Sequence, residues 1–210
     1  RLGGFNHYSK HSSRYSNWGH LRHRRVLNHE EATLNGKNYE EKVFPLIWAI
    51  MFPNTVLAES NPYQNMHCHY DYWWRCLNKG RWRIYKLEIK YKIKGWGVYV
   101  LWELLNVNGD IGWGLGEADL IIFGAEDGVY VVNRAKVTAY ICKKLGIQPN
   151  IKSIREAESC LFENSPMWKL CHRISRPNER TIKIPFEEFM TFVSPFFLNR
   201  YKENENRFRY

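Results

Sequence analysis

Two carboxylates and a lysine lie on neighbouring strand candidates in the first half of the chain. Glu88 and Lys90 are two residues apart in the alternating stretch 83–94, RIYKLEIKYKIK, so both side chains share one strand face. Asp71 lies upstream in a second strand candidate, HCHYDYWWR. Carboxylate oxygens are ligands that Mg²⁺ prefers, and a nearby ammonium stabilises the negative charge that develops during phosphodiester hydrolysis. The pattern therefore predicts metal-dependent hydrolysis of a phosphodiester, with Asp71 and Glu88 as metal ligands.

The same residues leave two interpretations open. The backbone carbonyl of Ile89 lies between Glu88 and Lys90 and is a candidate further metal ligand. Mg²⁺ is the expected cofactor, with Mn²⁺ as its substitute. The opposing interpretation is that Glu88 and Lys90 are ordinary solvent-facing residues of an amphipathic strand, since a bare Asp…Glu-x-Lys string also occurs by chance.

Other residue types offer weaker candidates. His67 and His69 precede Asp71, and we interpret them as partly exposed strand residues, although His69 could approach a metal from the face that it shares with Asp71. The five cysteines include no C-x-x-C pair, which predicts free thiols in a reducing compartment and gives no support to a zinc site. The stretch 110–117, DIGWGLGE, has the glycines of a flexible loop but is not a phosphate-binding P-loop.

The composition favours a folded protein with a polyanionic partner. The 210 residues suffice for one compact domain with appendages, and the apolar content of 44% excludes a disordered chain. A net charge of +10 favours nucleic acid, because Lys and Arg neutralise phosphates. No apolar run approaches the length of a membrane span and the first residues show no signal-peptide pattern, so we expect a cytoplasmic protein without a membrane partner.

Helix and strand patterns surround the candidate site. A helical stripe is predicted after Asn38 with an interruption at Pro45, and its apolar members are Tyr39, Val43, Leu46, Ile47 and Ile50. The segment 55–60, TVLAES, is a candidate for a short buried strand. Residues 78–80, NKG, predict a turn that joins the strand around Asp71 to the strand of Glu88 in an antiparallel hairpin.

The second half of the chain continues the mixture of strands and helices. Strands are predicted at 97–105, 118–124, 128–133 and 181–185. A helix is predicted at 135–146, AKVTAYICKKLG, with Gly146 as its C-terminal stop, and another at 186–193, FEEFMTFV. This order predicts an α/β or α+β sandwich.

The arrangement resembles the PD-(D/E)xK nuclease superfamily, which has the restriction-endonuclease-like fold. In that family a helix, three antiparallel strands, a helix and a strand follow one another; an Asp opens the second strand and Glu-x-Lys lies on the third. Asp71, Glu88 and Lys90 match these positions. The resemblance implies an α/β (α+β) protein with a restriction-endonuclease-like core, in which helices flank a mixed central sheet.

Further matches and departures define how far the resemblance extends. The family often adds a Glu from the first helix, and the pattern G-x-x-Y-E-x-x-V at 36–43 selects Glu40 rather than Glu41 for that position. An Ala-Asp before an apolar strand, here at Asp119, is similar to phage-type and resolvase-like members. The departures are Tyr70, which stands where a Pro often precedes the Asp, and a longer, glycine-rich segment between residues 94 and 119.

The resulting domain scheme has three parts, and basic residues in two of them are expected to contact DNA. We predict a basic arm at 1–35, a nuclease core at 36–146 and a C-terminal extension packed on the core at 147–210. The expected DNA-binding residues are Lys79, Arg81, Arg83, Lys92, Arg22, Arg24 and Arg25. Most tryptophans are expected in the core, but five could stack on unpaired bases: Trp73, Trp74, Trp82, Trp96 and Trp113.

Together these features predict a Mg²⁺-dependent DNA endonuclease of restriction, homing or junction-resolving type. Asp71 and Glu88 would bind the metal, Lys90 would orient water or stabilise the phosphorane, and Glu40 would assist the metal shell. Duplex or branched DNA and a second copy of the chain are the expected partners, since two sites cut two strands most easily. The resemblance implies a bacterial or phage-infected host cell. The alternative is a non-catalytic nucleic-acid-binding or phage structural protein with a nuclease-like fold.

Overall fold

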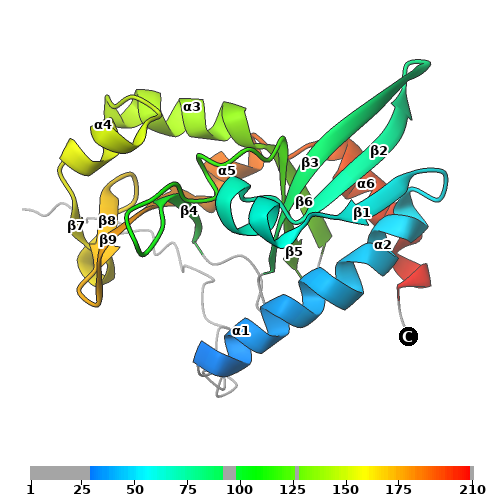
Figure 1. The fold of residues 1–210 in the computed structure, drawn as a ribbon, viewed down its shortest axis with the longest axis horizontal. Coiled ribbons are helices and arrows are strands. Elements are labelled where there is room, and N and C mark those ends of the chain that lie inside the picture. The colour runs from blue at the N-terminus through cyan, green and yellow to red at the C-terminus, as the bar shows by residue number, and fades with distance from the viewer. Residues whose placement is uncertain (1–28, 92–97, 126–127, 209–210) are drawn as a thin grey trace, which may run out of the picture.

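A five-stranded mixed sheet and a four-stranded mixed sheet form the framework of the computed structural model, which describes residues 29–91, 98–125 and 128–208 (Figure 1). The predicted DNA-binding residues Arg22, Arg24, Arg25 and Lys92 lie outside these residues. Among the helices that are described, none has the length and apolar character needed to cross a membrane.

The larger sheet carries the predicted chemistry. Its order is β1-β2-β3-β5-β6, with β3 and β5 parallel and every other neighbouring pair antiparallel. The strands run as β1 Val56–Glu59, β2 Tyr72–Asn78, β3 Arg81–Tyr91, β5 Leu120–Ala125 and β6 Gly128–Asn133. All five strands are confirmed, but β1 was predicted to be buried and is mostly exposed, because it forms the edge of the sheet.

A tight turn joins β2 to β3, as the NKG sequence predicts. Lys79 and Gly80 have φ values of 49° and 73°, and Asn78 pairs with Arg81. Two consecutive positive φ angles define a two-residue turn whose twist matches that of the flanking strands, which explains the glycine. The hairpin is long and extends away from the rest of the molecule (Figure 1).

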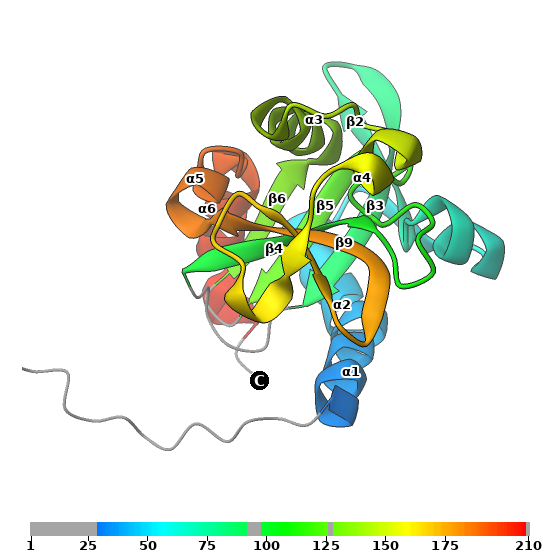
Figure 2. The ribbon, with the colours of Figure 1, turned by 90° about the vertical axis from the view of Figure 1, so that its left-hand side faces the viewer.

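The smaller sheet was not predicted as a unit. It has the order β4-β9-β8-β7, formed by β4 Tyr99–Leu105, β9 Arg176–Pro185, β8 Leu170–Arg173 and β7 Cys160–Leu161. The predicted strand at 181–185 is the end of β9. Figure 2 views the molecule from the side of this sheet. Because β4 belongs to the predicted core and β9 to the predicted C-terminal extension, the two regions share one sheet.

Helices cover both faces of the larger sheet. One face packs against α1 His29–Asn38, the π-helical turn η1 Tyr39–Val43, α2 Phe44–Met51 and α6 Pro195–Asn204. The other face packs with the smaller sheet against α3 Arg134–Leu145, α4 Ile151–Glu156 and α5 Phe186–Met190. Gly146 ends α3 with a left-handed φ of 68°, as predicted, whereas α5 ends before the predicted residue 193. Three short turns complete the chain: η2 Gln64–Cys68, η3 Phe162–Asn164 and η4 Glu205–Arg207.

The predicted apolar stripe of the first helices is confirmed in part. Val43 and Ile47 pack against the core as predicted, but they are only partly buried. Phe44, Trp48 and Met51 are fully buried, whereas Leu46 is 67% exposed. The cause is η1, because a π-helical turn takes more residues per turn than an α-helix and rotates every later side chain. Tyr39 in this turn is buried and stacks on Tyr91, with ring centroids 4.4 Å apart.

Gly124 makes room for this stacked ring. A Cβ added at Gly124 would overlap the Tyr39 ring, so Gly124→Ala is expected to displace η1 and to lower the free energy of unfolding by about 1–3 kcal/mol. Gly36→Ala is the matched control, because a Cβ there has open space and alanine favours a helix over glycine by about 0.5–1 kcal/mol. Urea unfolding of both variants tests this, and equal effects would contradict the role assigned to Gly124.

Candidate active site

Asp71 lies at the point where β2 separates from β3. Its backbone N–H donates to the Leu87 carbonyl at 2.7 Å, and its Oδ2 accepts a hydrogen bond from the Ile89 N–H at 2.6 Å. Its other oxygen, Oδ1, accepts from Asn65 Nδ2 at 2.5 Å. The Asp71 carboxylate thus takes the place of the strand partner that β3 lacks beyond Leu87. This hydrogen bond holds Asp71 beside Glu88 and Ile89. The sequence placed Asp71 inside a strand, whereas β2 begins at the next residue.

Glu88 and Lys90 form an ion pair inside the molecule. Lys90 Nζ lies 2.5 Å from Glu88 Oε1. Glu88 is only 4% exposed, and one third of the Lys90 side chain is exposed. The alternative interpretation of Glu88 as a solvent-facing residue is therefore wrong. Both faces of β3 are covered here, since Lys90 lies 5.9 Å from the ring centroid of Trp113, which packs against the smaller-sheet core.

Glu40 reaches the same region from η1. Tyr72 Oη donates to the Glu40 carbonyl at 2.8 Å, which ties η1 to the start of β2. Glu40 and Asp71 line one open cleft of about 700 Å³, here called the acidic cleft; its other lining residues are Glu41, Glu59, Ser60, Pro62, Asn65, Met66 and Tyr72. Glu41 is exposed and lies 3.7 Å from Lys37, which supports the choice of Glu40.

Burial and mutual repulsion change the titration of these groups. The pKa of Glu88 is raised to about 7, chiefly by burial, which Lys90 opposes and the Asp71 and Glu40 charges reinforce. Burial likewise raises the pKa of Glu40 to about 7, opposed by Lys90 and reinforced by Asp71. Burial acts to lower the pKa of Lys90, but Glu88, Asp71 and Glu40 together raise it above its ordinary value. The ammonium therefore stays charged near neutral pH.

These charges fit a divalent cation, although the side chains are not arranged around one. Among the described residues, no three His, Cys, Asp or Glu side chains form a group that could hold a metal as they stand. Glu88 is paired with Lys90, and Asp71 is bonded to Asn65 and the Ile89 amide. Three carboxylates face a single ammonium, however, and this excess of negative charge would be balanced by a divalent cation held between Asp71 and Glu88.

Two further titratable residues influence Lys90 or are influenced by it: His69, for which the sequence left open an approach to a metal, and Glu103, to which it assigned no role. His69 was interpreted as a strand residue, but it follows η2 with a left-handed φ of 54°. Burial, with a contribution from Lys90, lowers its pKa. Burial also raises the pKa of Glu103 on β4, and the charge of Lys90 opposes this rise. A single carboxylate in the apolar stretch 97–105 was the signal that could have identified Glu103.

The glycine-rich stretch 110–117 is a packing element. A Cβ at Gly114 would overlap the Glu103 carbonyl, to which the Gly114 N–H donates at 2.8 Å. A Cβ at Gly116 would lie 2.6 Å from the Cβ of His69. The absent side chains therefore let this loop lie directly between β4 and the segment before Asp71.

The predicted DNA-binding residues that are described lie on the β2–β3 hairpin. Lys79, Arg81 and Arg83 are all exposed. Strand alternation places Arg81 and Arg83 on the face of Leu87, opposite to the face of Glu88. Asp119, the acid of the Ala-Asp pair, accepts a hydrogen bond from the Lys86 N–H at 2.8 Å and so joins β5 to β3.

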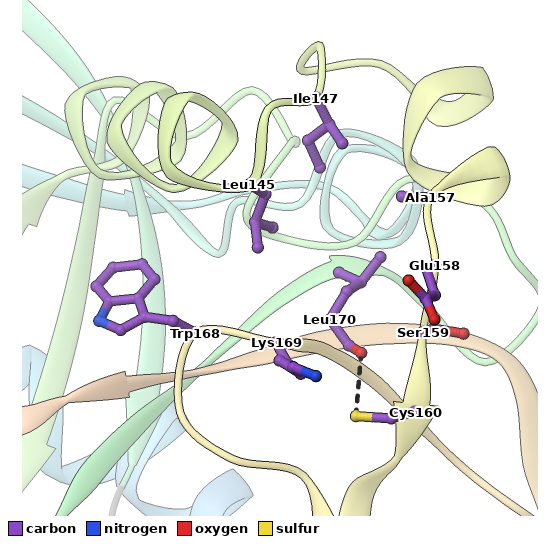
Figure 3. Close-up of a pocket in the computed structure, with 9 residues that line it drawn as sticks. All are labelled: Leu145, Ile147, Ala157, Glu158, Ser159, Cys160, Trp168, Lys169 and Leu170. Carbon is purple, nitrogen blue, oxygen red and sulfur yellow. Dashed lines mark hydrogen bonds between the residues drawn. The ribbon is translucent and has the colours of Figure 1, made fainter.

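A separate pocket lies between the end of α3 and the smaller sheet (Figure 3). Leu145, Trp168 and Leu170 supply much of its apolar lining, and Cys160 Sγ donates to the Leu170 carbonyl at 3.6 Å. None of the candidate site residues that the structure describes lines it. Asp71 lies instead in the acidic cleft, and Glu88 is buried in the interior.

Comparison of the chain with protein-family models, with curated proteins and with solved structures gave no match. A functional assignment therefore rests on the geometry of the site.

The raised pKa of Glu88 predicts how stability depends on pH. The unfolded chain releases this proton near pH 4.5, whereas the folded protein holds it up to about pH 7, so the folded state binds more protons in this range. The contribution of Glu88 to stability therefore falls as the pH rises from about 4.5 to about 7. Glu88→Gln, which mimics the protonated acid, should match the wild type at pH 4 and exceed its free energy of unfolding by on the order of 1–3 kcal/mol at pH 8.

Urea unfolding at the two pH values measures this difference. Glu41→Gln controls for the loss of one carboxylate, because its side chain is exposed. A Glu88→Gln protein that is less stable than the wild type at pH 8 would contradict the assigned charge balance.

Proposed function

We propose that this protein is a metal-dependent endonuclease that hydrolyses phosphodiester bonds in DNA. The observation that carries the proposal is the buried Glu88–Lys90 pair next to Asp71, which is fixed by the Ile89 amide at the open edge of β3. A carboxylate pair with a positively charged neighbour is the set that phosphodiester hydrolysis requires. The net charge of +10 agrees with a polyanionic substrate.

The order of elements supports a restriction-endonuclease-like core. A helical segment precedes three antiparallel strands, Asp71 stands directly before the second strand, and Glu88 and Lys90 lie on the third. The next strand of this sheet, β5, is parallel to β3. The departure is the connection between β3 and β5, where β4 and the glycine-rich stretch 110–117 are described in place of the family's helix.

Asp71 and Glu88 would hold Mg²⁺ through their carboxylate oxygens, and the Ile89 carbonyl is a proposed further ligand. When bound, the ion would polarise the scissile phosphate and lower the pKa of an attacking water. Glu88 would then have to turn its oxygen away from Lys90, to which it is now paired. The ion would also offset the charges of Asp71 and Glu40, whose repulsion adds to the effect of burial on the pKa of Glu88.

Lys90 and Glu40 have complementary roles in the proposed reaction. The Lys90 ammonium, released from Glu88, can stabilise the negative charge that develops on the phosphate. Glu40 has a pKa of about 7, so it can accept a proton from water near neutral pH and return it. Both side chains are positioned by secondary structure, Lys90 by β3 and Glu40 by η1.

Cleavage of supercoiled plasmid and of a four-way junction tests the proposal. The wild type should cut at least one substrate with Mg²⁺ and neither with EDTA. Asp71→Asn, Glu88→Gln and Lys90→Met should each lower the cleavage rate at least about 100-fold, because each removes a group that acts on the metal or the phosphate. Their DNA affinity without metal should be retained, as measured by fluorescence anisotropy. Salt-sensitive binding without any cleavage would instead favour the non-catalytic DNA-binding alternative.

Adjacent glutamates provide a matched pair for the role of Glu40. Glu40→Gln should slow cleavage by about 100-fold or more, because it removes the proton acceptor. Glu41→Gln removes the same charge from an exposed neighbour and should cut within about twofold of the wild-type rate. Single-turnover cleavage rates at pH 8 compare the two variants, and equal rates would remove Glu40 from the mechanism.

A further inference from the structure

The β2–β3 hairpin exposes an unusual group of large apolar side chains. Leu77, Trp82 and Ile84 are 59%, 55% and 59% exposed, and Val56 on the neighbouring β1 is 56% exposed. Exposed apolar groups that gather on one surface commonly mark a binding site. We call these four residues the hairpin patch. The hairpin that carries three of them projects beyond the rest of the described molecule (Figure 1).

Strand pairing places the hairpin patch on the face that carries the candidate active site. Leu77 is paired with Trp82, and Arg75 is paired with both Ile84 on β3 and Val56 on β1. Directly paired residues share a face of the sheet. Alternation along β3 then puts Trp82 and Ile84 on the face of Glu88 and Lys90. From Trp82 to Glu88 is six residues, or roughly 20 Å at about 3.3 Å per residue.

The surface between the hairpin patch and the site is basic and aromatic. The Arg75 guanidinium lies 4.5 Å from the Trp82 ring centroid. Closer to the site, Lys86 Nζ lies 5.0 Å from the ring centroid of Tyr70 and 5.5 Å from that of Trp73. Trp82 is exposed and Trp73 partly exposed, whereas Tyr70 is buried. A cation next to an exposed ring, as at Arg75 and Trp82, combines attraction for phosphates with a platform on which a base can stack.

The structure also separates the tryptophans that the sequence grouped together. Trp74 is buried in the core, and Trp113 packs against the smaller-sheet core. Trp96 lies outside the described residues. Trp82 is the one of the five that is described as largely exposed, and Trp73 is partly exposed on the same face. Stacking on bases is therefore a role for Trp82 first.

We propose that the hairpin patch binds an unpaired strand of the nucleic acid whose phosphodiester the site cuts. The proposal rests on the proposed function, because it names the substrate class of that site as DNA with a single-stranded segment beside a duplex. A stacked strand covers the roughly 20 Å from Trp82 to Glu88 with about six nucleotides at about 3.4 Å each. Base stacking does not depend on sequence, so we expect recognition of DNA structure.

Charge favours this occupant over a second copy of the chain. The patch adjoins the exposed cations Arg75 and Lys79, which would face the same cations of a partner copy across a symmetric contact. Lys86, nearer the site, is already paired with Glu117 at 2.6 Å and adds less to this repulsion. Phosphates of a strand would neutralise Arg75 and Lys79 instead. The test distinguishes a protein interface from a DNA site, because substitutions in an interface would change the oligomeric state and leave DNA binding unchanged.

Binding to three fluorescent DNA probes tests the proposal without requiring cleavage. The probes are a blunt duplex, the same duplex with a ten-nucleotide single-stranded tail, and the tail alone, all measured by anisotropy in EDTA. The wild type should bind the tailed duplex at least 10-fold more tightly than the blunt duplex. Trp82→Ala should weaken binding of the tailed duplex by about 5- to 100-fold and leave the blunt duplex within twofold. Trp82→Phe, which keeps a ring, should retain most of the preference.

Two exposed arginines of the same hairpin supply a matched control. Arg75→Gln, on the face of the patch, should weaken binding of the tailed duplex more than Arg83→Gln, on the opposite face. Equal affinity for tailed and blunt duplexes in the wild type, or no effect of Trp82→Ala, would overturn the proposal. A dimer that Trp82→Ala converts to a monomer in sedimentation, with DNA binding unchanged, would overturn it in favour of a subunit interface.

The two proposals can fail separately. Tail-selective binding that depends on Trp82, without cleavage under any condition, would support the hairpin site and reject the endonuclease. Mg²⁺-dependent cleavage that is lost in Glu88→Gln but unchanged in Trp82→Ala for both tailed and blunt duplexes would support the endonuclease and reject the hairpin site.

Discussion

The site depends on one ammonium group that is surrounded by carboxylates. Lys90 is paired with Glu88 and lies in the field of Asp71 and Glu40, so its charge favours the ionised form of the buried Glu88. An unpaired buried carboxylate is costly, and burial of a pair is favourable only if the remaining oxygens and protons find partners. One lysine cannot balance three carboxylates. Burial is the main cause of the raised pKa values of Glu88 and Glu40, and the neighbouring carboxylates add to it against the opposing effect of Lys90.

The fold brings these charged groups together because the pairing of β2 with β3 ends before Glu88. β2 joins β3 only from Tyr72 onward, so the next amide of β3 that needs a partner is satisfied by the Asp71 carboxylate instead of by a strand. Above this opening, β4 and the glycine-rich stretch 110–117 cover the face of Glu88 that an isolated antiparallel sheet would leave in water. Ile121, which is paired with Glu88, packs in the same core as Trp102 of β4, so the smaller sheet covers the face of the larger sheet on which Glu88 lies.

The parts that the sequence predicts well are those fixed by neighbours along the chain. The positive φ angles of Lys79 and Gly80 and the left-handed Gly146 follow from local turn and cap chemistry. The Glu-x-Lys alternation places Glu88 and Lys90 on one face for the same reason. Features that depend on contacts between distant parts of the chain were missed. The smaller sheet pairs β4 with β9, about 80 residues later in the sequence. Glu103 becomes a candidate site residue only because the fold brings it near Lys90. The π-helical turn η1, which no periodicity signals, shifted the predicted stripe of α2.

The distribution of charge gives the site and the hairpin different tasks. The acidic cleft would repel a phosphate backbone, because Glu40, Glu41, Glu59 and Asp71 all line it. In the proposed endonuclease, affinity for DNA would therefore come from elsewhere on this basic chain. The hairpin is suited to provide this affinity, because its exposed cations can exchange water for phosphate at little cost in desolvation. A backbone held there would bring one phosphate up to the carboxylates, and a divalent cation between them would turn that repulsion into attraction. On this view the excess negative charge is what makes binding of substrate and of metal mutually dependent.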